Sequence, residues 1–310
     1  MEYQDFLCAV LCRLKKVLED SADVEIYESM KNNGNLRKGI IIKEKGRNIG
    51  PVIYMEEFYD RYNKGVSLEK NISDILNFYR KIRCPVNWDC NDLLDIEKAK
   101  DKLAIKLINY SRNKEYLKGC PYVRVLDLAA IFFIVVDVKK DGLATVVITN
   151  EYMKHWNVSK LELYEMALNN SCRVLPAKFA TMQDTLTNLM FGEEFNSSVM
   201  FTEDEQAKEM YVLTNEYRNC GASCILYKGV LDMIGDMLNR NFFILPSSIH
   251  EVIILPAYEN MEAGRIDCII DDVNTNLVTD EELLGNHCYM YDRVTKEIHF
   301  GYDFKTEISQ

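Results

Sequence analysis

The chain has 310 residues, 48% of them hydrophobic, which is enough for one large domain or two of ordinary size. Its 14 glycines and 6 prolines are few for this length, which argues against a disordered or low-complexity protein. The net charge of −11 and the pI near 5.0 oppose nonspecific binding to phosphate backbones, so nucleic acid is a disfavoured partner.

Features of export, membrane insertion and metal binding are missing from the sequence. The N-terminal residues lack the basic and apolar regions of a secretory signal. The longest apolar run, Leu128 to Val136, is shorter than the roughly 20 residues of a membrane-spanning helix. The ten cysteines are dispersed, and the pairs Cys8/Cys12 and Cys220/Cys224 do not have zinc-knuckle spacing. We therefore expect a cytoplasmic protein with reduced thiols, no membrane contact, no metal and no cofactor.

The first third of the chain alternates helical and strand patterns. Apolar residues at helical spacing predict a helix over about 6–18. Two apolar runs around the turn-rich stretch 31–35 predict a β-hairpin, with strands at 24–27 and 39–42. Pro51 is typical of a first helical turn and predicts a helix that carries residues 52–62. A second helix is expected at Leu68 to Ile82.

Strand patterns dominate the middle and the end of the chain. They are expected at 104–109, 123–138 and 143–148, with Asp141-Gly142 as a hairpin turn, and in a final hairpin formed by 288–291 and 298–300. The polar, acidic stretch 192–209 predicts a mobile loop. Together these patterns predict an α+β fold with mixed or antiparallel sheets and packed helices.

Two domains are expected, and the alternative of one continuous unit stays open. Residues 1–118 form an N-terminal helix, hairpin and helix region in this interpretation, and residues 119–310 form a C-terminal α+β region.

Two short segments, Val147–Tyr152 and Val212–Tyr217, differ only at their second residue. In each case an apolar strand is expected before Thr-Asn-Glu-Tyr, and a helix and a strand ending in Leu-Pro after it, at 175–176 and 245–246. This order predicts two loosely similar strand-helix-strand units. We favour a helix-capping role for Thr and Asn, with a duplicated binding site at Asn150 and Asn215 as the alternative.

The most distinctive segment is Leu245–Pro256, which contains serine, histidine and glutamate close together. These residue types predict a hydrolase site, in which His250 activates Ser248. A strand through this segment, however, places Glu251 on the face opposite His250, and no Gly-x-Ser-x-Gly elbow is present. Two other interpretations stay open: a structural role in hydrogen bonding, and a ligand pocket lined by Ser247, Ser248, His250 and Glu251.

Other motifs give little support to a known chemistry. His155-Trp156 and His287-Cys288 are interpreted as packing residues. No glycine-rich phosphate loop and no His-Glu-x-x-His sequence occurs.

Five segments of the chain are distinctive in combination: Lys31–Gly34, Asn48–Tyr54, Leu107–Tyr110, Tyr211–Asn215 and Pro246–Glu251. Together they resemble a bacterial family of unknown function, domain-of-unknown-function family 5688. The resemblance covers nearly the whole chain and implies a cytoplasmic protein of gut-type anaerobic bacteria, often encoded near mobile elements. It implies no activity and no catalytic residues. The C-terminal half is also distantly similar to a second uncharacterised bacterial family.

The leading functional hypothesis is a binding or regulatory protein with a macromolecular partner, since no catalytic constellation stands out. The alternative is a hydrolase-like enzyme or a small-ligand binder. Its pocket would lie around Ser248 and His250 and include the turns at Thr149-Asn150 and Thr214-Asn215.

Overall fold

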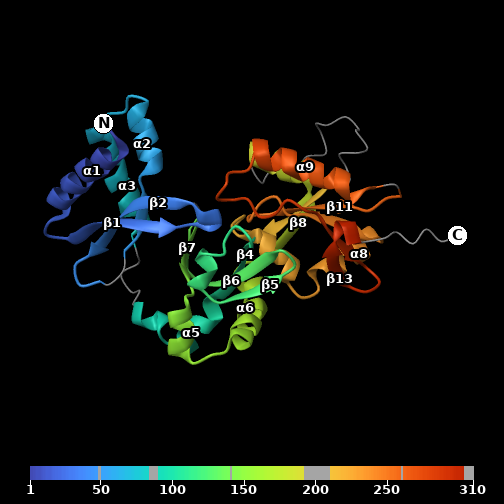
Figure 1. Cartoon of the computed structure of the whole chain (residues 1–310). Coiled ribbons are helices and arrows are strands. Elements are labelled where there is room, and N and C mark those ends of the chain that lie inside the picture. The colour runs from blue at the N-terminus through green and yellow to red at the C-terminus, as the bar shows by residue number, and fades with distance from the viewer. Residues whose placement is uncertain (48–49, 84–89, 140–141, 192–209, 260, 304–310) are drawn as a thin grey trace. The chain divides into compact units, whose positions relative to one another are not determined.

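The computed structural model describes residues 1–47, 50–83, 90–139, 142–191, 210–259 and 261–303 (Figure 1). The chain divides into two compact units, Met1–Asp95 and Ile96–Gln310. Helices pack on antiparallel sheets in both, which confirms the predicted α+β class. No helix in the described ranges is long and apolar enough to cross a bilayer. The loop predicted at 192–209 lies outside the described residues.

The first unit is a three-stranded antiparallel sheet covered by helices. Its elements are α1 (Tyr3–Leu18), β1 (Ala22–Met30), β2 (Leu36–Glu44), β3 (Val52–Tyr54), α2 (Glu56–Asn63) and α3 (Leu68–Ile82). The strand order is β1-β2-β3, and the β1-β2 hairpin turns at Asn33 and Gly34, which both have positive φ. The predicted first helix, hairpin and last helix of this region are confirmed. Their apolar faces form one core, centred on fully buried Phe6, Ile40 and Ile75.

The prediction of a helix over residues 52–62 is wrong for its first residues. Val52–Tyr54 is strand β3, which pairs with Gly39–Ile41 of β2, and the helix begins only at Glu56. Pairing with the preceding strand β2 buries Ile53, and this overrides the helical preference of an isolated proline signal.

The second unit begins with a sheet around the long strand β6. Short helical turns, Ile96–Ala99 and Lys100–Lys102, lead into β4 (Leu103–Asn109), β5 (Tyr122–Val125), β6 (Leu128–Lys139) and β7 (Gly142–Val147). Helices α5 (Asn150–Trp156) and α6 (Lys160–Val174) follow. Ser171 of α6 accepts a hydrogen bond from the Ile105 backbone N–H at 3.0 Å, which fixes this helix on β4.

Two sequence expectations differ from this sheet. Every residue of β4 pairs with β6, so β4 lies in the compact unit Ile96–Gln310, whereas the sequence interpretation divides the chain at 118/119. The expected strand 123–138 is two antiparallel strands, joined by a tight turn in which Leu126 has a φ of 53°. The β6-β7 hairpin is confirmed, although Asp141 of its turn lies outside the described residues.

The second sheet of this unit has six antiparallel strands in the order β13-β12-β10-β11-β9-β8. Its elements are β8 (Ala177–Thr181), α7 (Met182–Phe191), β9 (Tyr211–Asn215), α8 (Val230–Leu238), β10 (Phe242–Leu245), β11 (Val252–Pro256), α9 (Ala263–Asn276), β12 (Tyr289–Asp292) and β13 (Glu297–Phe300). Helix α9 packs on one face, over Phe243 and Met290. Helix α8 covers the other face, where Gly235 lies against Tyr291. The final hairpin, β12-β13, is confirmed.

The two copies of Thr-Asn-Glu-Tyr have different structures. In the first, Asn150 begins α5, and the Thr149 side chain makes no capping hydrogen bond. In the second, Thr214 and Asn215 lie within β9, and no α-helix follows directly. Leu175 ends helix α6, so the strand predicted to end at 175–176 is wrong, whereas β10 does end at Leu245. The Thr149 side chain therefore does not make the expected capping bond, and Asn215 accepts the backbone N–H groups of a turn instead of a helix.

Candidate functional site

The segment Pro246–Glu251 connects β10 to β11 and is not part of a strand. This corrects the expected continuous strand, because Leu245 and Ile253 are paired and the residues between them must reverse the chain. Backbone hydrogen bonds tie the segment to residues 282–285: Ile249 N–H to Glu282 O at 2.8 Å, and Leu284 N–H to Ser247 O at 3.1 Å. The Ala222 N–H also donates to Ile249 O at 3.3 Å, so two separate parts of the chain hold the segment in place.

The side chains of Ser248 and His250 do not form a nucleophile-base pair. Ser248 Oγ accepts a hydrogen bond from the His250 backbone N–H at 3.0 Å. His250 Nδ1 accepts one from the Cys220 backbone N–H at 3.3 Å, and its Nε2 lies 3.7 Å from Glu282 Oε1. Both ring nitrogens thus face other groups than Ser248, and the geometry favours the structural interpretation of this segment.

Thr214 and Asn215, at the end of β9, lie close to His250 of the Pro246–Glu251 segment. Thr214 Oγ1 donates to His250 O at 2.7 Å. Asn215 Oδ1 accepts from the Tyr217 and Asn219 backbone N–H groups, at 3.0 and 3.3 Å, so this side chain shapes the turn after β9. Ser247, Ser248 and Asn215 are all buried, which leaves them little surface for a ligand.

Asn150 does not share hydrogen bonds with that cluster. Its Nδ2 donates to Lys118 O at 2.8 Å, and this bond connects α5 to the turn that precedes β5. The duplicated binding site expected at Asn150 and Asn215 is thus not assembled through these side chains. Glu251 is half-buried, and burial raises the pKa of its carboxyl.

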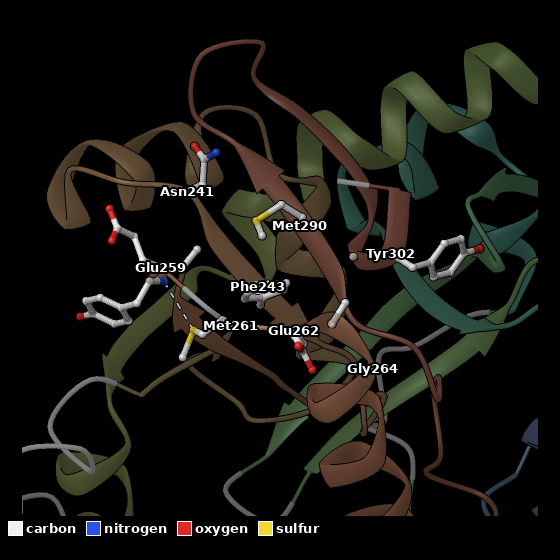
Figure 2. A pocket seen from close by; sticks show the side chains of 12 residues that line it. Asn241, Phe243, Glu259, Met261, Glu262, Gly264, Met290 and Tyr302 are labelled. Atoms are coloured by element: carbon white, nitrogen blue, oxygen red, sulfur yellow. Dashed lines mark hydrogen bonds between the residues drawn. The ribbon is translucent and has the colours of Figure 1, made fainter. Parts of the chain in front are cut away.

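A hollow of about 540 Å³ opens at the N-terminal end of α9, on the α9 face of the six-stranded sheet (Figure 2). Phe243 and Met290 are cross-strand neighbours on β10 and β12 and form part of its lining. Figure 2 shows Phe243, Met290, Met261 and Glu262 around the hollow. The lining residues are Asn241, Phe243, Ala257, Tyr258, Glu259, Met261, Glu262, Ala263, Gly264, Met290, Gly301 and Tyr302.

The lining combines apolar side chains with two carboxylates. Met261 is partly exposed, and its sulfur accepts a hydrogen bond from the Tyr258 N–H at 3.5 Å. The Arg240 guanidinium lies 4.3 Å from the centre of the Tyr258 ring. Glu262 forms an ion pair with exposed Arg265 at 3.3 Å, an interaction that water screens strongly.

A histidine-carboxylate pair lies beside this hollow. His287 Nδ1 is 3.1 Å from Asp267 Oδ2, and the His287 ring meets the Tyr302 ring edge-on at 6.4 Å. Asp267 also accepts the Cys288 backbone N–H at 2.7 Å, and Cys288 is buried beneath Gly301. The packing role expected for Cys288 is consistent with this burial, but half-exposed His287 belongs to a polar pair. Its partner on α9 is too distant in sequence for spacing to indicate it.

In their neutral forms, His250 and His287 are expected to be different tautomers. A ring nitrogen that accepts an N–H bond is unprotonated, and one that faces a carboxylate carries the proton. His250 is therefore protonated at Nε2, and His287 at Nδ1. Long-range ¹H–¹⁵N correlation spectra distinguish these forms, and the same tautomer at both sites would contradict the assignment.

Residues 3–293 match the profile of a family of unknown function, DUF5688. The chain belongs to this family. No curated protein and no solved structure matches it.

Two buried cysteines of this DUF5688 member, Cys224 and Cys288, are poorly suited to nucleophilic chemistry. Both are free thiols, and burial raises the pKa of Cys224 and of Cys288 to about 12. A thiol with so high a pKa is a poor nucleophile near neutral pH. Within the described ranges, no group of three or more His, Cys, Asp or Glu side chains is placed to hold a metal ion.

The stability of this DUF5688 protein is expected to fall in mild acid because of His250. Burial lowers the pKa of His250 below 6.5, Glu282 opposes this shift, and Lys106 adds to it. The unfolded chain therefore binds a proton at this residue before the folded chain does. The contribution to stability is complete above pH 6.5 and is lost as the pH falls below that value.

Urea denaturation at about pH 7.5 and about pH 5.5, on either side of the ordinary histidine pKa, measures this effect. Wild-type protein should lose more stability between the two than His250→Gln, whose amide oxygen still accepts the Cys220 N–H. Equal losses in the two proteins would show that another group causes the pH dependence.

Proposed function

We propose that this protein is a binding protein that recognises a segment of a partner protein through the hollow at the N-terminal end of α9. The segment would insert an apolar side chain between Phe243 and Met261 and place a lysine or arginine beside Glu259 and Glu262. The observation that supports this most directly is the combination of apolar lining and carboxylates in one hollow.

The size and chemistry of the hollow suit an inserted side chain. Its volume of about 540 Å³ lies within the range of ligand sites, roughly 300–1,000 Å³. Methionine side chains, such as those of Met261 and Met290, are unbranched and adapt to ligands of different shape. Burial of one leucine- or methionine-sized side chain contributes roughly 1.5–3 kcal/mol.

Charge favours a basic segment. Residues 96–310 contain 22 Lys and Arg but 32 Asp and Glu, so most of the negative charge of the chain belongs to the unit that carries the hollow. Complementary charge accelerates association and disfavours acidic competitors.

The hydrolase alternative around Ser248 and His250 is less well supported. His250 Nδ1 already accepts a backbone hydrogen bond, and Ser248 Oγ accepts the His250 N–H. A general base must reach the proton that it removes, and these contacts direct the imidazole away from Ser248.

A bacterial, cytoplasmic setting is part of the proposal. The free thiols in the described part of the chain fit a reducing compartment. The family resemblance implies the same setting.

A peptide library displayed on phage and selected on the full chain tests the proposed function. Selected peptides should share one apolar residue next to Lys or Arg. Their binding should weaken at least ~10-fold, or about 1.4 kcal/mol, in Gly264→Trp and in Glu259→Lys/Glu262→Lys. Gly264 suits this test because a Cβ there meets no atom within 4 Å, so the new side chain enters open space.

Glu165→Lys, an exposed charge reversal on α6, is the matched control and should bind like wild type. Peptides that bind Gly264→Trp as tightly as wild type would place the recognition site elsewhere. Selected peptides without a basic residue would remove the charge component of the proposal.

A further inference from the structure

Strand β3 of the first unit is the open edge of its sheet. Among the residues that the structure describes, it pairs only with β2, in the order β1-β2-β3. Hydrogen bonds from Met55 N–H to Lys38 O (3.1 Å) and from Ile42 N–H to Pro51 O (3.2 Å) fix the alternation of the ladder. In this register Val52 and Tyr54 are in the non-hydrogen-bonded pairs, so their backbone N–H and C=O groups point away from β2.

A hollow of about 630 Å³ lies along this edge. It is lined by three successive residues of β3, Val52, Ile53 and Tyr54, and by α2 and α3. Successive side chains of a strand point to opposite faces of the sheet, so a hollow on one face would not contact three residues in a row. Because this hollow contacts all three residues, it lies along the backbone edge of β3. The opposite edge differs, because β1 carries Asp23, Glu25 and Glu28, and charges of this kind protect an edge against pairing.

The side chains around the hollow carry an excess of positive charge. Arg37, Arg61 and Lys81 line it together with Glu57 and Asp74. Asp74 is already paired with both Arg61 and Lys70, the latter at 3.0 Å. The Tyr54 ring lies under two cations, with Lys31 Nζ 4.4 Å and Arg37 Cζ 5.6 Å from its centre.

We propose that β3 is a second interaction site, independent of the hollow at α9, and that it binds an extended acidic segment of a partner protein as a fourth strand. The main chain of the segment would pair with Val52 and Tyr54. Its carboxylates would meet Arg37 and Lys81. Strand addition at an open edge is an established mode of peptide recognition, in which main-chain bonds supply affinity and neighbouring side chains supply selectivity. Because β3 has only three residues, the charged walls must supply much of the affinity.

NMR titration of the ¹⁵N-labelled full chain tests this site. The probe is a synthetic peptide of alternating valine and glutamate, and the controls are a valine-lysine peptide and a valine-glutamate peptide that is N-methylated at every residue. The glutamate peptide should shift the amide signals of Val52 and Tyr54. Both control peptides should bind at least ~10-fold more weakly. The double variant Arg37→Glu/Lys81→Glu should weaken binding of the glutamate peptide, whereas Arg13→Glu, on the exposed face of α1, should not.

Three results would overturn the proposal. Shifts confined to residues away from β3 would place the acidic-peptide site elsewhere. Equal affinity of the N-methylated peptide would show that no strand is added. Concentration-dependent shifts of Val52 and Tyr54 without peptide would identify a second copy of this chain as the occupant. Binding at the α9 hollow is measured with different variants, Gly264→Trp and Glu259→Lys/Glu262→Lys. A negative result at one site therefore leaves the result at the other site unaffected.

Discussion

Gly221→Ala is expected to lower the free energy of unfolding by about 1–3 kcal/mol, the usual cost of forcing an extra methyl group into a packed site. An added Cβ would lie 2.5 Å from His250 O and 2.7 Å from Asn215 N, and closer still to Thr214 Oγ1. Two of these contacts are backbone atoms, which cannot move aside as a flexible side chain can. Urea denaturation measures the loss.

Gly264→Ala is the matched control for this substitution. Its Cβ meets no atom within 4 Å, and its φ is not positive, so alanine should stabilise α9 by about 0.5–1 kcal/mol. The tautomer of His250 gives a second measurement, because a shifted Gly221 loop would break the hydrogen bond from Cys220 N–H to Nδ1. Wild-type stability and an unchanged His250 signal in Gly221→Ala would contradict the packing described here.

Phe6→Ala is expected to destabilise the first unit by about 3–5 kcal/mol, as for other buried phenylalanines. Phe6 is fully buried, and its ring lies 5.4 Å from Tyr59 and 5.3 Å from Tyr62. The loss should be confined to residues 1–95, because the compact units have separate cores. Hydrogen exchange followed by mass spectrometry measures the two units in one experiment.

Phe132→Ala provides the reciprocal measurement. Phe132 is fully buried in β6 of the second unit, so its removal should accelerate exchange in residues 96–310 and leave the first unit protected. If both variants accelerate exchange along the entire chain to the same extent, the two units unfold as one, and the separation of their stabilities is refuted.

Elements whose signal is local could be predicted from the sequence. Helix α3 has the predicted bounds, Leu68–Ile82, because its apolar residues recur at helical spacing and Ser67 caps its first turn. The β1-β2 hairpin was also predictable, since Asn and Gly supply the positive φ of its turn. In both cases residues close in sequence determine the structure.

Elements that depend on pairing between strands were missed or displaced. Val52–Tyr54 is a strand only because β2 pairs with it, and β4 joins the second unit only because β6 lies beside it. The turn at Leu126 requires a positive φ, which leucine seldom adopts. The local sequence therefore did not predict a turn at this position. Strand pairing is decided by contacts that a local pattern does not contain.

The sequence by itself determined the α+β class and the acidic charge, because local periodicity and composition carry these properties, and the segments that resemble DUF5688 indicated the family. It also identified Ser248 and His250 as unusual, but their hydrogen bonds depend on Cys220 and Glu282, which lie far away along the chain. The α9 hollow unites β10, β12, the start of α9 and residues 301–302. Only the tertiary structure brought these segments together, since a concave site is a property of packing between elements and not of any one of them.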